Sequence, residues 1–89
     1  MEKRKIHLVV LSPVQKLFDG EVSWVELPGE QGRFQVLFNH AALISSLTAG
    51  KIMYGQDDNT GREGCEIIDI EGGFVEVGNN TVSVCVETV

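Results

Sequence analysis

The sequence predicts an all-β fold, a two-sheet β-sandwich of short strands. Short apolar or alternating runs are separated by glycine-containing turns along all 89 residues. No long stretch has the three-to-four residue apolar spacing of a helix. Many short strands with such turns are typical of a sandwich or barrel. The length predicts one domain, residues 1–89.

The first part of the chain predicts three strands. Ile6–Leu11 is an apolar run that contains two valines, and Gln15–Asp19 is a short strand that ends at an Asp19-Gly20 turn. Glu21–Leu27 follows and has apolar side chains on both faces. A strand of this kind is buried on both faces or carries a partner on one of them.

A turn is predicted at Pro28-Gly29, since proline presets φ and glycine accepts a positive φ at the next position. Gly32 and Gly50 mark further points where the backbone can turn. Arg33–Phe38 then forms another strand. His40–Leu47 has partly helical spacing, but turns flank this short run, which leaves its structure open between helix and strand.

The second half predicts four further strands. They are Lys51–Tyr54, Cys65–Ile70, Phe74–Val77 and Thr81–Glu87, with a polar hairpin tip at Gln56–Gly61 and a tight turn at Asn79-Asn80. Thr81–Glu87 alternates most regularly of all. It directs Val82, Val84 and Val86 to one face and Cys85 to the polar face.

Composition excludes several classes of function. The formal net charge of -6 disfavours nucleic acid and anionic lipid surfaces, both of which bind basic faces. No apolar run is long enough for a signal peptide or a transmembrane helix. With Cys65 and Cys85 expected as reduced thiols, the sequence predicts a cytoplasmic protein.

The sequence offers no catalytic or metal-binding pattern, and we expect no cofactor. His40 stands alone in an apolar stretch, which favours a structural histidine whose ring bonds nearby backbone. His7, Cys65 and Cys85 lack the spacing of metal ligands. The carboxylates Asp57-Asp58, Glu66, Asp69 and Glu71 are expected in a loop tip or facing solvent.

Two aromatic residues are candidates for the core or for binding. Trp24 is expected in the core, as large aromatics in small sandwiches usually are. For Phe38 the alternatives stay open, because an inward-packed ring and an exposed contact residue fit the sequence equally well.

Four motifs, in order and at matching spacing, resemble the N-terminal β domain of the F-type ATP synthase ε subunit. They are Leu17, Phe18, Gly20 and Val22; then Leu27, Pro28, Gly29 and Gly32; then Val36, Leu37, His40, Ala41 and Leu43 with Leu47 and Gly50; and finally Gly72, Gly73, Phe74, Glu76 and Val77 with Asn80, Val82 and Val84. The chain departs from the family pattern at Gln35, which replaces a glycine, and at Phe38, Ala42 and Ala49, which replace prolines.

The resemblance implies a non-catalytic subunit of the central stalk. Its partners would be the γ subunit, the membrane c-ring and, through γ, the F1 α/β assembly. It would transmit ring rotation to γ in proton-driven ATP synthesis, without inserting into lipid, at the cytoplasmic face of the inner membrane. The resemblance also favours an extended His40–Leu47, and the ending at Val89 suggests a form without the family's inhibitory C-terminal helical hairpin.

By position, the resemblance assigns two segments to the surface that faces the c-ring. The first comprises Gly29, Glu30, Gln31, Gly32 and Arg33, and the second comprises Phe38, Asn39, His40, Ala41 and Ala42. A free-standing β-sandwich that binds a ligand or peptide along an open edge is the alternative function.

Overall fold

The computed structural model describes residues 4–56 and 65–88, which form nine strands and no helix. The prediction of an all-β fold is confirmed. The strands are β1 (Ile6–Leu11), β2 (Lys16–Val22), β3 (Trp24–Gly29), β4 (Gly32–Val36), β5 (Leu43–Leu47), β6 (Gly50–Gly55), β7 (Glu66–Ile70), β8 (Gly72–Gly78) and β9 (Thr81–Glu87).

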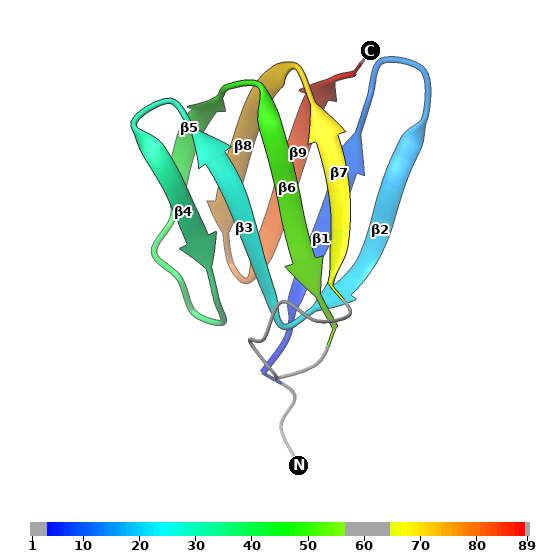
Figure 1. Cartoon of the computed structure of the whole chain (residues 1–89). Helices are drawn as coiled ribbons and strands as arrows, with labels where there is room; N and C mark the ends of the chain where they lie inside the picture. The colour runs from blue at the N-terminus through cyan, green and yellow to red at the C-terminus, as the bar shows by residue number, and fades with distance from the viewer. Residues whose placement is uncertain (1–3, 57–64, 89) are drawn as a thin grey trace.

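The strands form one curled sheet that makes both layers of the sandwich. Hydrogen-bonded neighbours follow the order β2-β1-β9-β8-β5-β3-β6-β7, with β4 on the other side of β3. The first layer contains β2, β1, β9, β8 and β5, and the second contains β4, β3, β6 and β7 (Figure 1). The layers join at a corner where β5 meets β3 through the single pair Gly29 and Leu47.

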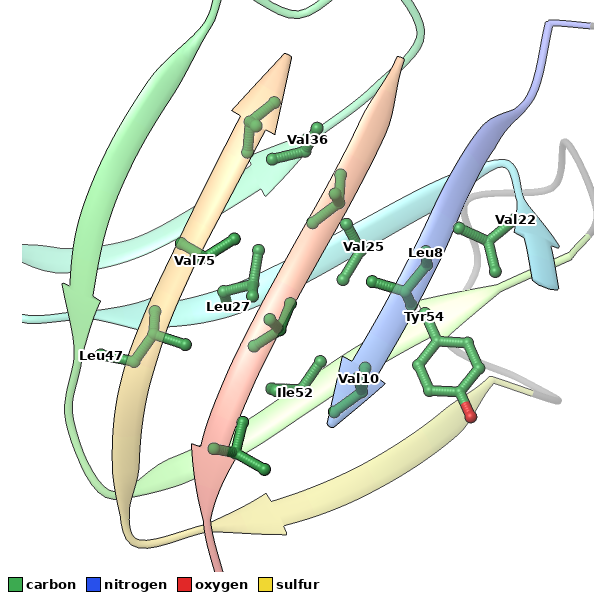
Figure 2. Packing of buried hydrophobic residues seen from close by; sticks show 14 of the residues in the cluster. Leu8, Val10, Val22, Val25, Leu27, Val36, Leu47, Ile52, Tyr54 and Val75 are labelled. Atoms are coloured by element: carbon green, nitrogen blue, oxygen red, sulfur yellow. The ribbon is translucent and has the colours of Figure 1, made fainter. Parts of the chain in front are cut away.

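The core lies between the two layers and consists of aliphatic side chains with one tyrosine (Figure 2). Val82, Val84 and Val86 all point into it, as the alternation of their strand predicts. Trp24 is buried as predicted, with 2% of its surface exposed, but it lies outside this cluster. Alternation along β3 turns Val25 inward and Trp24 outward, where the indole covers Gly55: a Cβ on this glycine would lie 2.5 Å from Nε1.

The predicted turn at Asp19-Gly20 is wrong, because β2 runs straight through it. Gly20 pairs with Leu8 in the sheet, and a Cβ there would lie 3.1 Å from the ring of Phe18. The glycine therefore makes room for an aromatic side chain. The chain instead reverses at Ser12–Gln15, where the Ser12 N–H donates to the Gln15 carbonyl at 2.9 Å.

The turn predicted at Pro28-Gly29 is also wrong, since both residues belong to β3. The turn is at Glu30 and Gln31, and it is closed by the pair Gly29 and Gly32. Gly32 has φ 128°, which a residue with a side chain rarely adopts. Pro28 is tolerated inside a strand because β6 pairs with β3 only as far as Glu26, so the missing N–H breaks no ladder bond.

Other boundaries shift by a few residues. The strands predicted at Gln15–Asp19 and Glu21–Leu27 are divided at Ser23 instead, whose N–H donates to the Gly55 carbonyl at 2.7 Å. The strand predicted at Arg33–Phe38 ends at Val36, and His40–Leu47 resolves into the strand β5.

The remaining strands lie where the sequence predicts them. The Asn79-Asn80 turn is confirmed, with φ values of 50° and 57° that match a type I′ hairpin. The predicted tip Gln56–Gly61, with Asp57-Asp58, lies outside the described residues except for Gln56.

Candidate contact surface

The ten residues assigned to a contact surface fall at opposite ends of β4. Gly29–Arg33 spans the turn between β3 and β4 together with the first two residues of β4, and 38–42 belongs to the loop that follows this strand (Figure 1). Five residues of β-strand span roughly 15 Å. The fold therefore separates the two segments, which meet one partner together only if that partner lies along the β4 side of the sandwich.

The turn between β3 and β4 is a compact polar projection. Glu30 and Gln31 are exposed at its tip, and the Glu30 N–H donates to the Ser46 carbonyl of β5 at 3.2 Å. A Cβ on Gly29 would lie 2.8 Å from the Gly32 carbonyl oxygen, so this position requires glycine. A hollow between the turn and β5 is lined by residues that include Arg33, Ile44 and Ser46.

Arg33 is held along the outer face of the second layer. Its Nε donates to Glu26 Oε1 at 2.7 Å, and its Nη2 donates to the Lys51 carbonyl at 2.8 Å. The Glu26 side chain is only 14% exposed, which makes this the most shielded ion pair among the described residues. Arg33 therefore presents a cation that is already oriented by its own sheet.

The loop after β4 is fastened by local hydrogen bonds. Asn39 has φ 63°, and its N–H donates to Asn80 Oδ1 at 2.6 Å. The His40 N–H donates to the Leu37 carbonyl at 3.1 Å, and its Nδ1 lies 2.7 Å from the Ala41 carbonyl, to which it donates. The expected structural role of His40 thus matches its contacts. Phe38 is half-buried and outside the core cluster, which leaves both of its alternatives open.

The described residues give little support for chemistry at a site. They contain no group of three or more histidine, cysteine or acidic side chains that could hold a metal ion. Cys65 and Cys85 are free thiols. No helix in the described ranges is long and apolar enough to cross a membrane.

One ionic cluster joins β1 to β2 on the outer face. Asp19 accepts from Lys16 Nζ at 2.8 Å and lies 2.7 Å from His7 Nε2. The hydrogen bond from Lys16, followed by that from His7, lowers the pKa of Asp19 below its ordinary value of 3.8.

Sequence reasoning missed a second exposed surface, on the outer face of the first layer. Phe74 is 52% exposed there, and Ile44 is 75% exposed on the neighbouring strand. Strand pairing was the signal that would have revealed this surface, because it places the outward-facing residues of adjacent strands side by side. The paired residues are far apart in the chain, so the pattern of a single strand does not reveal the surface.

Comparison with known proteins agrees with this fold. Residues 5–89 match the family described as ATP synthase, Delta/Epsilon chain, beta-sandwich domain. The chain is 36% identical over 83 residues to the ATP synthase epsilon chain of Caulobacter vibrioides, covering 93% of this chain and 91% of that one. It is 37% identical over 84 residues to the epsilon chain of Leptospira borgpetersenii, and there it spans only 62% of the relative.

Solved structures share the fold at low sequence identity. A chain of the Euglena gracilis mitochondrial ATP synthase, in a structure of OSCP, F1 and the c-ring, has a TM-score of 0.83 at 17% identity. The match covers 94% of this chain and 51% of that one. A chain from the central stalk and c-ring of the Tetrahymena thermophila enzyme has a TM-score of 0.73 at 16% identity, with 98% and 66% covered. With a family match across residues 5–89 and a close relative covered almost end to end, the chain belongs to the β-sandwich family of ATP synthase delta and epsilon chains.

Proposed function

We propose that this chain is a non-catalytic rotor subunit of an F-type ATP synthase, which ties the γ subunit to the c-ring. The observation that carries the proposal is its similarity to the Caulobacter vibrioides epsilon chain across 91% of that protein. The complexes that contain the structural relatives include F1 and the c-ring in one case and the central stalk with the c-ring in the other. This supports the same setting in an ATP synthase here, and we further propose that this chain lies at the cytoplasmic face of the inner membrane.

A small sandwich whose strands are joined by ladder hydrogen bonds is suited to a mechanical role. All nine strands belong to one hydrogen-bonded sheet, so a force applied at one end is distributed over many ladder bonds. The polar turn at Glu30 and Gln31 offers a short, exposed contact, and Gly29 and Gly32 fix its shape. Such a turn is matched to polar loops on a partner.

We therefore assign the ring contact to the Gly29–Arg33 end. The loop 38–42 lies at the other end of β4. If the c-ring contacts the sandwich at the Gly29–Arg33 end, this loop faces away from the ring and toward γ. If the ring instead lies along the side formed by β4, both segments contact it, as the sequence resemblance implies.

The coupling role is tested by removing this chain from its own ATP synthase and adding it back. We expect the depleted membranes to hydrolyse ATP but to pump few protons, and the added chain to restore pumping. If pumping is equal with and without the chain, the proposed function is wrong.

The contact assignment is tested by cross-linking in the assembled complex. Gln31→Cys and Ala41→Cys are introduced separately in a Cys65→Ser, Cys85→Ser background, since both positions are exposed. We expect Gln31→Cys to cross-link to the c subunit and Ala41→Cys to γ. Cross-links of both variants to the c subunit would instead support the side-on arrangement.

A further inference from the structure

The loop between β4 and β5, residues 37–42, carries one of the two segments of the candidate contact surface. Its internal hydrogen bonds fix its shape: the His40 N–H donates to the Leu37 carbonyl, and His40 Nδ1 donates to the Ala41 carbonyl. Such bonds move with the loop, so they do not fix its place on the sandwich. In the part of the chain that the structure describes, the hydrogen bonds outside the strand ladders that join this loop to another segment both involve Asn80.

Asn80 has a rigid backbone. It lies in the turn between β8 and β9, where the pair Gly78 and Thr81 closes a two-residue hairpin. Its carbonyl accepts from the His7 N–H at 2.9 Å, which joins the turn to β1 as well. Both attachments use main chain alone, so a change in the Asn80 side chain leaves them in place. The side chain is therefore held at a fixed point relative to the first layer.

The Asn80 side chain contacts Asn39, which lies 41 residues earlier in the chain. Its Oδ1 accepts from the Asn39 N–H at 2.6 Å, and its Nδ2 donates to Asn39 Oδ1 at 3.1 Å. A side-chain amide supplies the donor and the acceptor that this contact needs. Asparagine also accepts the φ of 57° at position 80, as few residues with a side chain do. Asparagine thus meets both requirements of the position.

The same pair holds the least common backbone conformation of the loop. Asn39 has φ 63°, and its N–H is the group that Asn80 binds. The loop and the turn between β8 and β9 lie side by side at the lower end of the sandwich in Figure 1. A loop without this attachment would sample several positions, and a partner would have to order it on binding, at a cost in conformational entropy. The attachment to Asn80 orders the loop before a partner binds.

We infer that Asn80 is a positioning residue, which holds the loop 37–42 in the conformation that contacts a neighbouring subunit. It acts through Asn39 rather than by contact with the partner. This role rests on the proposed function, in which residues 38–42 form a subunit contact. The turn between β8 and β9, and not the loop sequence alone, then sets the conformation of that contact.

The first measurement is amide hydrogen exchange of the full chain, followed by NMR. Asn80→Gly keeps the positive φ and removes both side-chain bonds. We expect the protection factors of the Asn39 and His40 amides to fall at least about fivefold, as loss of a hydrogen bond predicts. The Ser12 amide, which donates to the Gln15 carbonyl in the turn at the other end of β1, should change less than about twofold, since it opens locally.

Two kinds of variant serve as controls for the chemistry of the pair. Asn79→Gly, at φ 50°, should leave the loop amides within about twofold of the parent. In Asn80→Asp the carboxylate still accepts from the Asn39 N–H, and the Asn39 amide turns so that its Nδ2 donates to the second oxygen. In Asn39→Asp the new carboxylate accepts from Asn80 Nδ2.

The aspartate variants form a double-mutant cycle. We expect each single variant to keep the protection of the loop within about twofold of the parent, because each retains both bonds. The double variant Asn39→Asp, Asn80→Asp sets two carboxylates against each other and should lose protection at least about fivefold. Rescue by either single aspartate, and loss in the double variant, distinguishes the pair from a general effect of substitution at these positions.

The second measurement uses the assembled ATP synthase. Ala41→Cys and Gln31→Cys, each in the Cys65→Ser, Cys85→Ser background, report on the two ends of β4. We expect Asn80→Gly to slow the cross-linking of Ala41→Cys to its partner at least about threefold, because a loop that samples several positions must be ordered on contact. Cross-linking of Gln31→Cys should be unchanged, whereas general unfolding would slow both.

Equal protection of the loop in the parent and in Asn80→Gly would overturn this role, and so would an equal loss in Asn79→Gly. The role is also rejected if Ala41→Cys cross-links to no subunit in the parent, or if Asn80→Gly slows both cross-links equally. Parent-like protection in the double aspartate variant would contradict the pairing of Asn39 with Asn80.

These outcomes are separate from the test of the rotor function. A chain that restores proton pumping, but whose loop protection does not change in Asn80→Gly, refutes the positioning role alone. A chain that fails to restore pumping refutes the rotor function, whatever the protection of its loop.

Discussion

Asn39 and Asn80 form a reciprocal pair across 41 residues of sequence. The Asn39 N–H donates to Asn80 Oδ1 at 2.6 Å, and Asn80 Nδ2 donates to Asn39 Oδ1 at 3.1 Å. Both have positive φ, at 63° and 57°. The Asn80 carbonyl also accepts from the His7 N–H at 2.9 Å. One asparagine thus joins the loop after β4, the turn before β9 and the start of β1.

Replacing Asn80 by glycine keeps the backbone conformation but removes both side-chain bonds. We expect a loss of about 1–3 kcal/mol in the free energy of unfolding, from two bonds of roughly 0.5–1.5 kcal/mol each. Urea unfolding measures it. Asn79→Gly is the matched control, since φ at Asn79 is also positive, at 50°. A loss no larger than that of the control would show that the pair contributes nothing.

Gly73 and Gly78 are predicted to differ sharply when changed to alanine. Gly73 has φ 148°, and a Cβ there would lie 2.2 Å from the Cys85 carbonyl oxygen. We expect Gly73→Ala to cost more than about 3 kcal/mol, because backbone strain and a clash with main chain add. At Gly78 the nearest atom would be Ala42 Cβ at 4.0 Å. Gly78→Ala should stay within about 1 kcal/mol of the parent in urea unfolding.

Asp19 should make stability depend on pH in the acidic range. Its pKa is lowered in the folded state, chiefly by Lys16 and then by His7. The stabilisation is therefore present above the ordinary value of 3.8 and is lost as the pH falls through the folded pKa. The difference in unfolding free energy between the parent and Asp19→Asn should shrink over that interval. Lys16→Gln should reduce the pH dependence, and an unchanged profile in that variant would contradict the assignment.

Tyr54 should ionise above its ordinary pKa of 10.0, because burial raises the pKa and the Glu66 carboxylate adds to it. The ring of Phe18 lies 4.4 Å from that of Tyr54, centroid to centroid, and helps to cover it. Phe18→Ala should therefore shift the phenol pKa back toward 10.0. The chain has one tyrosine, so phenolate absorbance reports this group alone.

The sign of the alkaline effect follows from the same shift. A raised folded pKa gives stability that is present below 10.0 and is lost as the pH rises through the folded value. Glu66→Gln should lower the Tyr54 pKa less than Phe18→Ala does, since burial is the larger cause. The reverse order would show that charge, and not burial, controls this group.

Local patterns predicted those parts of the fold that depend on neighbours in sequence. Thr81–Glu87 alternates cleanly, and Asn79-Asn80 accepts the positive φ of its turn, so strand and turn were both correct. The turns predicted at Gly20 and Pro28 were wrong because tertiary contacts, and not neighbours in sequence, explain why these residues occur there. Gly20 makes room for the Phe18 ring, and Pro28 sits where β3 has already separated from β6.

The candidate surfaces show the same division. Gly29–Arg33 and Phe38–Ala42 are close in sequence, yet β4 places them at opposite ends, which strand length alone could have indicated. The exposed outer face of the first layer depends on the register of β1, β8 and β9, which come from both ends of the chain. Motif spacing carries no information about such a register.

The parallel pairing of β1 with β9 has a consequence for synthesis on the ribosome. Among the described strands, β1 and its partner β2 pair with the rest of the sheet only through β9. The nascent chain can therefore form its early hairpins but cannot close the sandwich until residues 81–87 have emerged from the exit tunnel. Until then Leu8 and Val10, which are buried in the folded domain, stay exposed. Folding of the domain therefore depends on a late closure of the sheet, and we expect chaperones to bind the nascent chain before that step.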